Sequence, residues 1–133
     1  MKLEHFLGTD ICDTAYEIKA ILSKHDQNGY NEFWISNDDP FPFMAVLTKD
    51  QVAYVHFFDE DGSPGLRGPA DDDYKSAPDD ITVFYSNNGS EKMFIENCCV
   101  ISLNKAIAVI EEFFVTNKLP KNIRWDPLWE EIE

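Results

Sequence analysis

The sequence contains no hydrophobic run close to the roughly 20 residues that a helix needs to cross a bilayer. It is also poor in basic residues, with 11 Lys and Arg against 25 Asp and Glu, a formal net charge of -14. Nucleic acids and anionic membranes attract positive charge, so we expect the chain to bind neither directly. A basic protein partner is compatible with this charge, and so is an acidic surface that serves only solubility.

Cysteine and histidine are scarce, with three of each, and they show no metal-ligand spacing. Cys98 and Cys99 are adjacent, which leaves only Cys12 to pair. We therefore interpret all three as small buried hydrophobes in a protein of a reducing compartment. The first ten residues lack the apolar segment of a signal peptide, which predicts a cytoplasmic protein.

Catalytic motifs are absent: we find no nucleophile elbow, dinucleotide fingerprint or phosphate loop. The acidic run at 59–62 suggests calcium, but an EF-hand needs glycine at its sixth position and oxygen ligands before it. A loop starting at Asp59 has Pro64 at that position, and a loop with Gly62 there begins at Phe57. Both registers fail. The sequence thus predicts no metal, no cofactor and no enzymatic activity.

The chain has enough apolar residues for one globular domain over 1–133, with 44% hydrophobic and 14% aromatic residues. Residues 41–59 alternate in a way that predicts two strands joined by the turn 48–51. Both faces of this hairpin are apolar, so both need cover. The turn lacks glycine, and we expect a four-residue type I connection rather than a two-residue one.

Other segments predict further strands and two helices. We expect an α+β fold in which an antiparallel sheet of about five to six strands carries an N-terminal and a C-terminal helix. Asn88-Gly89 is a strong hairpin signal between two of the strands. The helices are expected at 11–25, capped by Thr9 or Asp10, and at 103–116, capped by Ser102. The strands are expected at 2–7, 32–36, 81–86 and 92–96, with a possible edge strand at 123–125.

Four aromatic or imidazole side chains are candidate binding groups. Strand positions favour a place in the core for Trp34 and Trp125, whereas Trp129 is equally consistent with exposure. His56 lies in an apolar strand, which favours a hydrogen-bonded core histidine over a metal ligand.

Residues 59–80 lose all hydrophobic periodicity and hold eight acids against two bases, with three glycines and three prolines. Long loops of this kind are usually functional or mobile. We predict that this loop contacts a partner. The alternatives are a carboxylate-based hydrolase that uses the same loop, and an acidic structural module without a partner. The candidate partner-binding residues are Asp59, Glu60, Asp61, Asp71, Asp72, Asp73 and Tyr74.

Residues 113–125, FFVTNKLPKNIRW, resemble the first-numbered immunity-protein family of bacterial polymorphic-toxin systems. Asn117 stands where glycine is usual in that family, and both residues tolerate positive φ. About two thirds of the chain agrees more loosely with the family. The match falls on Phe114, Thr116, Asn117, Leu119, Pro120, Ile123 and Trp125.

This resemblance implies an α+β fold and a non-enzymatic role, the neutralisation of a co-produced toxin. Toxins associated with the family are similar to nucleic-acid deaminases and less often to nucleases. A toxin of either class needs a basic groove for its substrate, and an acidic loop can occupy such a groove. The leading prediction is an antitoxin that covers the active site of its toxin.

Overall fold

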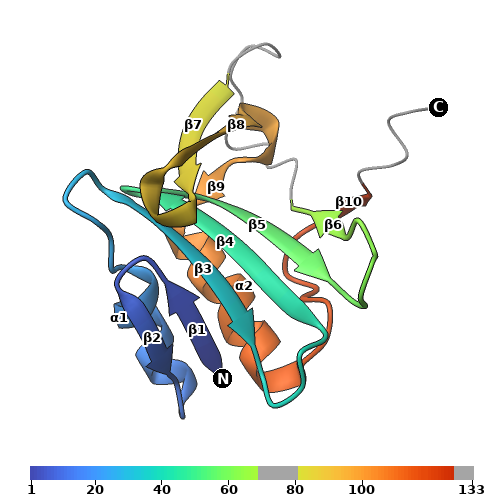
Figure 1. Ribbon diagram of the computed structural model, residues 1–133. Coiled ribbons are helices and arrows are strands. Elements are labelled where there is room, and N and C mark those ends of the chain that lie inside the picture. Colours follow the sequence, from blue (N-terminus) through green and yellow to red (C-terminus); the bar gives the residue numbers. More distant parts are fainter. Residues whose placement is uncertain (69–80, 128–133) are drawn as a thin grey trace.

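The computed structural model describes residues 1–68 and 81–127, and its centre is an antiparallel sheet with a long helix across one face (Figure 1). The strand order is β10-β6-β5-β4-β3-β1-β2, and β9 pairs with β5 beside this path. The predicted α+β fold is confirmed. The strands are β1 Lys2–His5, β2 Gly8–Ile11, β3 Tyr30–Ser36, β4 Phe43–Lys49, β5 Val52–Phe58, β6 Leu66–Arg67, β9 Ile101–Ser102 and β10 Asp126–Pro127.

The predicted central hairpin is formed by β4 and β5, but its turn differs from the expectation. Lys49 pairs with Val52, so the connection has two residues, and Asp50 adopts a φ of 51°. The prediction of a four-residue type I turn was therefore wrong. Aspartate is one of the few residues other than glycine that tolerate positive φ. The Asp50 N–H also donates to the Gly29 carbonyl at 2.9 Å, which holds this turn against the loop before β3.

The C-terminal helix α2, Leu103–Thr116, begins and ends where the sequence predicts. The Ser102 hydroxyl accepts a hydrogen bond from the Lys105 N–H at 3.1 Å, and Asn117 ends the helix with a φ of 53°. One side of α2 packs against the inner face of the sheet. The buried core joins Leu3, Phe33, Ile35, Met44, Val46, Ala53, Val55 and Phe57 of the strands to Leu103, Ala106, Ile107, Val109, Ile110 and Phe113 of α2.

The predicted N-terminal helix at 11–25 was largely wrong. Helix α1 covers only Ile18–Leu22, after a single 3-10 turn η1 at Ala15–Glu17. The proposed caps Thr9 and Asp10 lie instead in β2, which pairs with β1. Pairing with a neighbouring strand satisfies more backbone groups than a helical start would, so tertiary context overrides the local pattern. Ile11, the first residue of the predicted helix, is 60% exposed.

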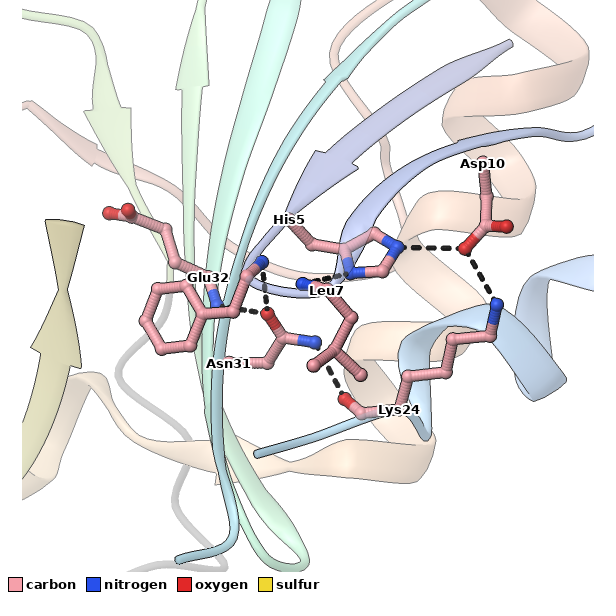
Figure 2. A network of polar contacts seen from close by, with 7 residues as sticks. His5, Leu7, Asp10, Lys24, Asn31 and Glu32 are labelled. Carbon is pink, nitrogen blue, oxygen red and sulfur yellow. Dashed lines mark hydrogen bonds and ion pairs between the residues drawn. The ribbon is translucent and has the colours of Figure 1, made fainter. Parts of the chain in front are cut away.

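A polar network fixes the β1–β2 turn to the segment before β3 (Figure 2). The buried Asn31 side chain accepts hydrogen bonds from the backbone N–H groups of Phe6 (3.0 Å) and Glu32 (2.8 Å). Its amide donates to the Lys24 carbonyl at 2.8 Å. In the same network Asp10 Oδ2 contacts the Lys24 ammonium at 2.8 Å and His5 Nε2 at 2.7 Å, and these two hydrogen bonds lower the pKa of the Asp10 carboxyl.

A second, two-stranded sheet covers part of the outer face of the main sheet. The Asn-Gly hairpin is confirmed, with β7 Ile81–Ser86, β8 Glu91–Glu96 and the turn η3 Asn87–Gly89. Figure 1 shows this hairpin crossing in front of one end of β3, β4 and β5. Phe84 and Val100 bury Leu47 of β4. Val100 follows the 3-10 turn η4, Asn97–Cys99. The other end of this face stays uncovered by the hairpin.

The far edge of the sheet contains a correction. Residues 59–80 were predicted as loop throughout, but Leu66–Arg67 forms β6 and pairs with His56 and Phe57 of β5. The edge strand predicted at 123–125 was also misplaced, because Asp126–Pro127 forms β10 against β6. Both strands have two residues, too few to leave an alternating pattern in the sequence.

Candidate protein-binding surface

Four aromatic rings gather at the end of the outer face that the β7–β8 hairpin does not cover, and we call them the aromatic row. Trp34 comes from β3, Phe43 from β4, Phe58 from β5 and Phe41 from the β3–β4 connection. Phe43 stacks on Phe58 with 4.6 Å between ring centroids and lies 5.7 Å from Trp34 and 5.2 Å from Phe41. Trp34 is 44% exposed, and the three phenylalanines are half-buried. The rings thus support one another while each keeps a surface open to solvent.

The pleat of the strands explains this arrangement. Phe33 and Ile35 point into the core beneath α2, so Trp34 between them must point outward. The core position predicted for Trp34 was therefore wrong. Trp125 is half-buried against the core, as expected, and its indole N–H donates to the Pro120 carbonyl at 2.7 Å. Trp129 lies outside the described residues.

Two acidic turns flank the aromatic row at the same end of the sheet. Because Ser36 pairs with Phe43 and Phe43 with Phe58, the chain leaves β3 and β5 at the same end. The turns 37–42 and 59–65 therefore lie at the same end of the sheet, and neither contains Lys or Arg. We call their five exposed carboxylates the acidic rim; they are Asp38, Asp39, Asp59, Glu60 and Asp61.

His56 fixes the turn 59–65 to the sheet. Its Nε2 lies 2.8 Å from the Pro64 carbonyl, which only accepts, so Nε2 carries the proton and donates. Nδ1 then accepts from the Tyr54 hydroxyl at 2.9 Å. The side chain is buried, with 8% of the residue exposed, and this burial lowers the pKa of His56. The predicted hydrogen-bonded core histidine is confirmed, and it positions the acidic turn.

The path of the chain from this turn back to the sheet also depends on Gly65. Its φ is 77°, and a Cβ atom there would lie 2.5 Å from the Phe57 carbonyl oxygen and 2.7 Å from His56 Nε2. Glycine allows the chain to pass this close to β5. The Gly65 N–H donates to the Ser63 hydroxyl at 3.1 Å, which closes the turn internally. Asp59, Glu60 and Asp61 are thus carried on an ordered turn beside the aromatic row.

Two further carboxylates stand beside Trp34. Glu4 of β1 is its cross-strand neighbour, and Glu32 precedes it by two residues on the same face. Burial raises the pKa of the Glu32 carboxyl, and hydrogen bonds from Asn87 and Trp34 oppose that rise. A shallow hollow of about 190 Å³ opens on the other side of the indole. It is lined by Lys2, Glu4, Trp34, Ile35, Ser36, Pro40 and Phe43.

The structure brings together only part of the predicted site. Asp59, Glu60 and Asp61 are exposed on the ordered turn, whereas Asp71, Asp72, Asp73 and Tyr74 lie outside the described residues. Exposed carboxylates on a turn lack the burial that tunes acids for catalysis, so these three do not support the hydrolase alternative.

Sequence reasoning did not identify the aromatic row. The signal was present in Phe43 and Phe58, because two apolar faces on one hairpin require two covers, and β7–β8 covers only part of the second face.

The described residues contain no group of three or more His, Cys, Asp or Glu side chains that could hold a metal ion. The three cysteines are free, and Cys12 and Cys99 are buried as predicted. Cys98 is exposed, which contradicts its expected burial. None of the helices in 1–68 and 81–127 is long and apolar enough to span a membrane.

Comparison with known proteins identifies a distant relative. The chain is 23% identical over 129 residues to a double-stranded DNA deaminase immunity protein of Burkholderia cenocepacia (strain H111). The alignment covers 96% of this chain and the whole of that protein, so the relationship is distant but extends over the full length. No protein-family model matches the chain. The similarity to an immunity protein is thus supported, and membership of the first-numbered family stays a prediction.

Proposed function

We propose that this chain is an immunity protein that binds and neutralises a cognate polymorphic toxin domain, specifically a nucleic-acid deaminase. The observation that carries the proposal is the full-length relationship to the deaminase immunity protein. In this role the chain is not an enzyme, needs no cofactor and contacts neither nucleic acid nor membrane. It acts in the cytoplasm, where the toxin would otherwise reach its substrate.

The charge of the surface supports this role. A deaminase that acts on nucleic acid carries a basic substrate groove, and a carboxylate-rich surface can occupy the groove in place of phosphate. Asp59, Glu60 and Asp61 provide such a surface on the turn held by His56. We propose that the acids at 71–73 and Tyr74, in the same segment of the chain, extend this contact and cover the active site. Opposite charge also raises the association rate.

The test uses the cognate toxin domain, in a catalytically inactive form for binding and in the active form for protection of cells. We expect a stable complex with the wild-type chain. Changing Asp71, Asp72 and Asp73 together to Asn should weaken binding at least tenfold, about 1.4 kcal/mol. The melting temperature should stay close to wild type, because the sequence predicts these acids on a surface loop, where charges contribute little to stability.

A matched control removes three charges from the helical side of the molecule: Asp13→Asn, Glu17→Gln and Glu111→Gln. This variant has the same net charge as the first but should bind the toxin almost as the wild type does. Equal weakening in both variants would mean that only overall charge matters. Full binding and protection by the 71–73 variant would place the contact elsewhere. Failure of the wild type to bind the toxin domain would refute the proposed function.

A further inference from the structure

We propose that the aromatic row binds an arginine-bearing segment of the protein partner, and that it supplies the direct contacts in recognition. This inference rests on the proposed function only for the identity of the partner. The row itself is a property of the fold. Trp34 is 44% exposed, and Phe43 lies at the centre of the row because it contacts the other three rings.

Contacts within the protein hold the row in place. Phe58 stacks on one side with Phe43 and on the other with His56, at centroid distances of 4.6 and 4.4 Å. His56 is in turn held by hydrogen bonds to Tyr54 and Pro64. Side chains that are already ordered lose little conformational entropy on binding, so such a surface binds more tightly than a flexible one of the same area.

The acidic rim decides which chemical group fits the row. A purely apolar partner segment would remove water from the carboxylates at 59–61 and 38–39 without giving these charges a partner. A second copy of this chain would bring two acidic rims together, which like-charge repulsion disfavours. A guanidinium group suits both the aromatic row and the acidic rim, because its plane stacks on aromatic rings and its N–H groups donate hydrogen bonds to carboxylates.

The hollow beside Trp34 gives such a side chain a place to lie. It is bounded by the indole, by Phe43 and by the Glu4 carboxylate, and its volume is about 190 Å³. Lys2, which lines it, is paired with Glu4 at 3.0 Å. An arginine entering here can stack on Trp34 and compete with Lys2 for Glu4. Arg67 of β6 is the cross-strand neighbour of His56.

The first experiment uses short peptides as probes, so that its outcome does not depend on the toxin. Peptides of Gly alternating with Arg, Lys or citrulline are titrated into the ¹⁵N-labelled protein. We expect the Trp34 indole N–H to shift with the Arg peptide, with binding at least tenfold weaker for the neutral citrulline peptide. The Trp125 indole, bonded to the Pro120 carbonyl, serves as an internal control that should not move. Equal affinity for the citrulline peptide would overturn the inference.

The second experiment measures the complex with the inactive toxin domain. Trp34→Ala should raise the dissociation rate at least tenfold, because Trp34 faces outward and its removal leaves the core intact. Tyr16→Ala is the matched control, since Tyr16 is 93% exposed on the helical side.

If Trp34→Ala binds as the wild type does, the proposed function stands and this inference fails. If the wild type binds the Arg peptide but not the toxin, the inference that the aromatic row binds arginine stands and the proposed function fails. A wild-type dimer that Trp34→Ala converts to monomer would make a second copy the occupant and overturn the inference.

Discussion

Replacing Phe113 with alanine should remove a large part of the stability of this domain. Phe113 is completely buried, and its ring meets Phe57 of β5 edge-on, with 6.2 Å between centroids and an angle of 82°. Truncating a buried phenylalanine costs about 3–5 kcal/mol through lost burial and the cavity left behind. Domains of this kind are stable by only about 5–15 kcal/mol, so about a fifth or more of the total is at stake.

Urea denaturation provides the measurement. With a slope of about 2 kcal/mol per M, a loss of 4 kcal/mol lowers the midpoint by about 2 M while the slope stays unchanged. Ile110→Ala, also in a fully buried position of α2, should cost about 2–5 kcal/mol. Val115→Ala is the control on the same helix: Val115 is 76% exposed, and its substitution should change stability by no more than about 0.5 kcal/mol. If Phe113→Ala and Val115→Ala shift the midpoint equally, α2 does not pack on the sheet as described.

Four further results are expected. Ser102→Ala removes the cap of α2 and should cost about 0.5–2 kcal/mol in the same urea assay, whereas Ser102→Thr should retain most of the stability. Asn31→Ala leaves three backbone groups without their partner and should cost at least about 2 kcal/mol. Burial lowers the pKa of His56 below its ordinary 6.5, so the unfolded chain takes up the proton first as pH falls. The free energy of unfolding should therefore decrease as pH drops below about 6.5, and this part of the pH dependence should vanish in His56→Gln. Association with the toxin domain, followed by stopped flow, should slow as salt rises from about 50 to 500 mM while dissociation changes little; an association rate indifferent to salt would contradict the role of the acidic rim.

The regular elements with strong patterns could be predicted from the sequence, and those decided by distant partners could not. Ser102 and Asn117 mark the ends of α2 because capping is a local interaction. The N-terminal segment reads as a helix because its apolar residues follow a helical period. Its expected caps Thr9 and Asp10 and its first residue Ile11 nevertheless pair with β1, and Asn31, twenty residues further along, holds the turn between the two strands. No local pattern contains that information.

The candidate surface was predictable in charge but not in shape. The acids at 59–61 stand out in the composition, and the structure carries them on an ordered turn. Trp34 looked like a core residue because tryptophan in a strand is usually buried. Its exposure depends on how far β7–β8 extends over the sheet, which follows from the packing of Phe84 rather than from the sequence around Trp34.

The alternation along β3 gives the molecule a way to change partners without losing its fold. Phe33 and Ile35 are constrained by the core, while Trp34 between them is constrained only by what it meets outside. Mutations at outward positions are therefore nearly neutral for stability, and selection on recognition can act on them freely. A lineage of such proteins can diverge rapidly on one side of the sheet while the other side drifts slowly. Because the two sides of the sheet change at different rates, we expect low overall sequence identity between relatives that share a fold.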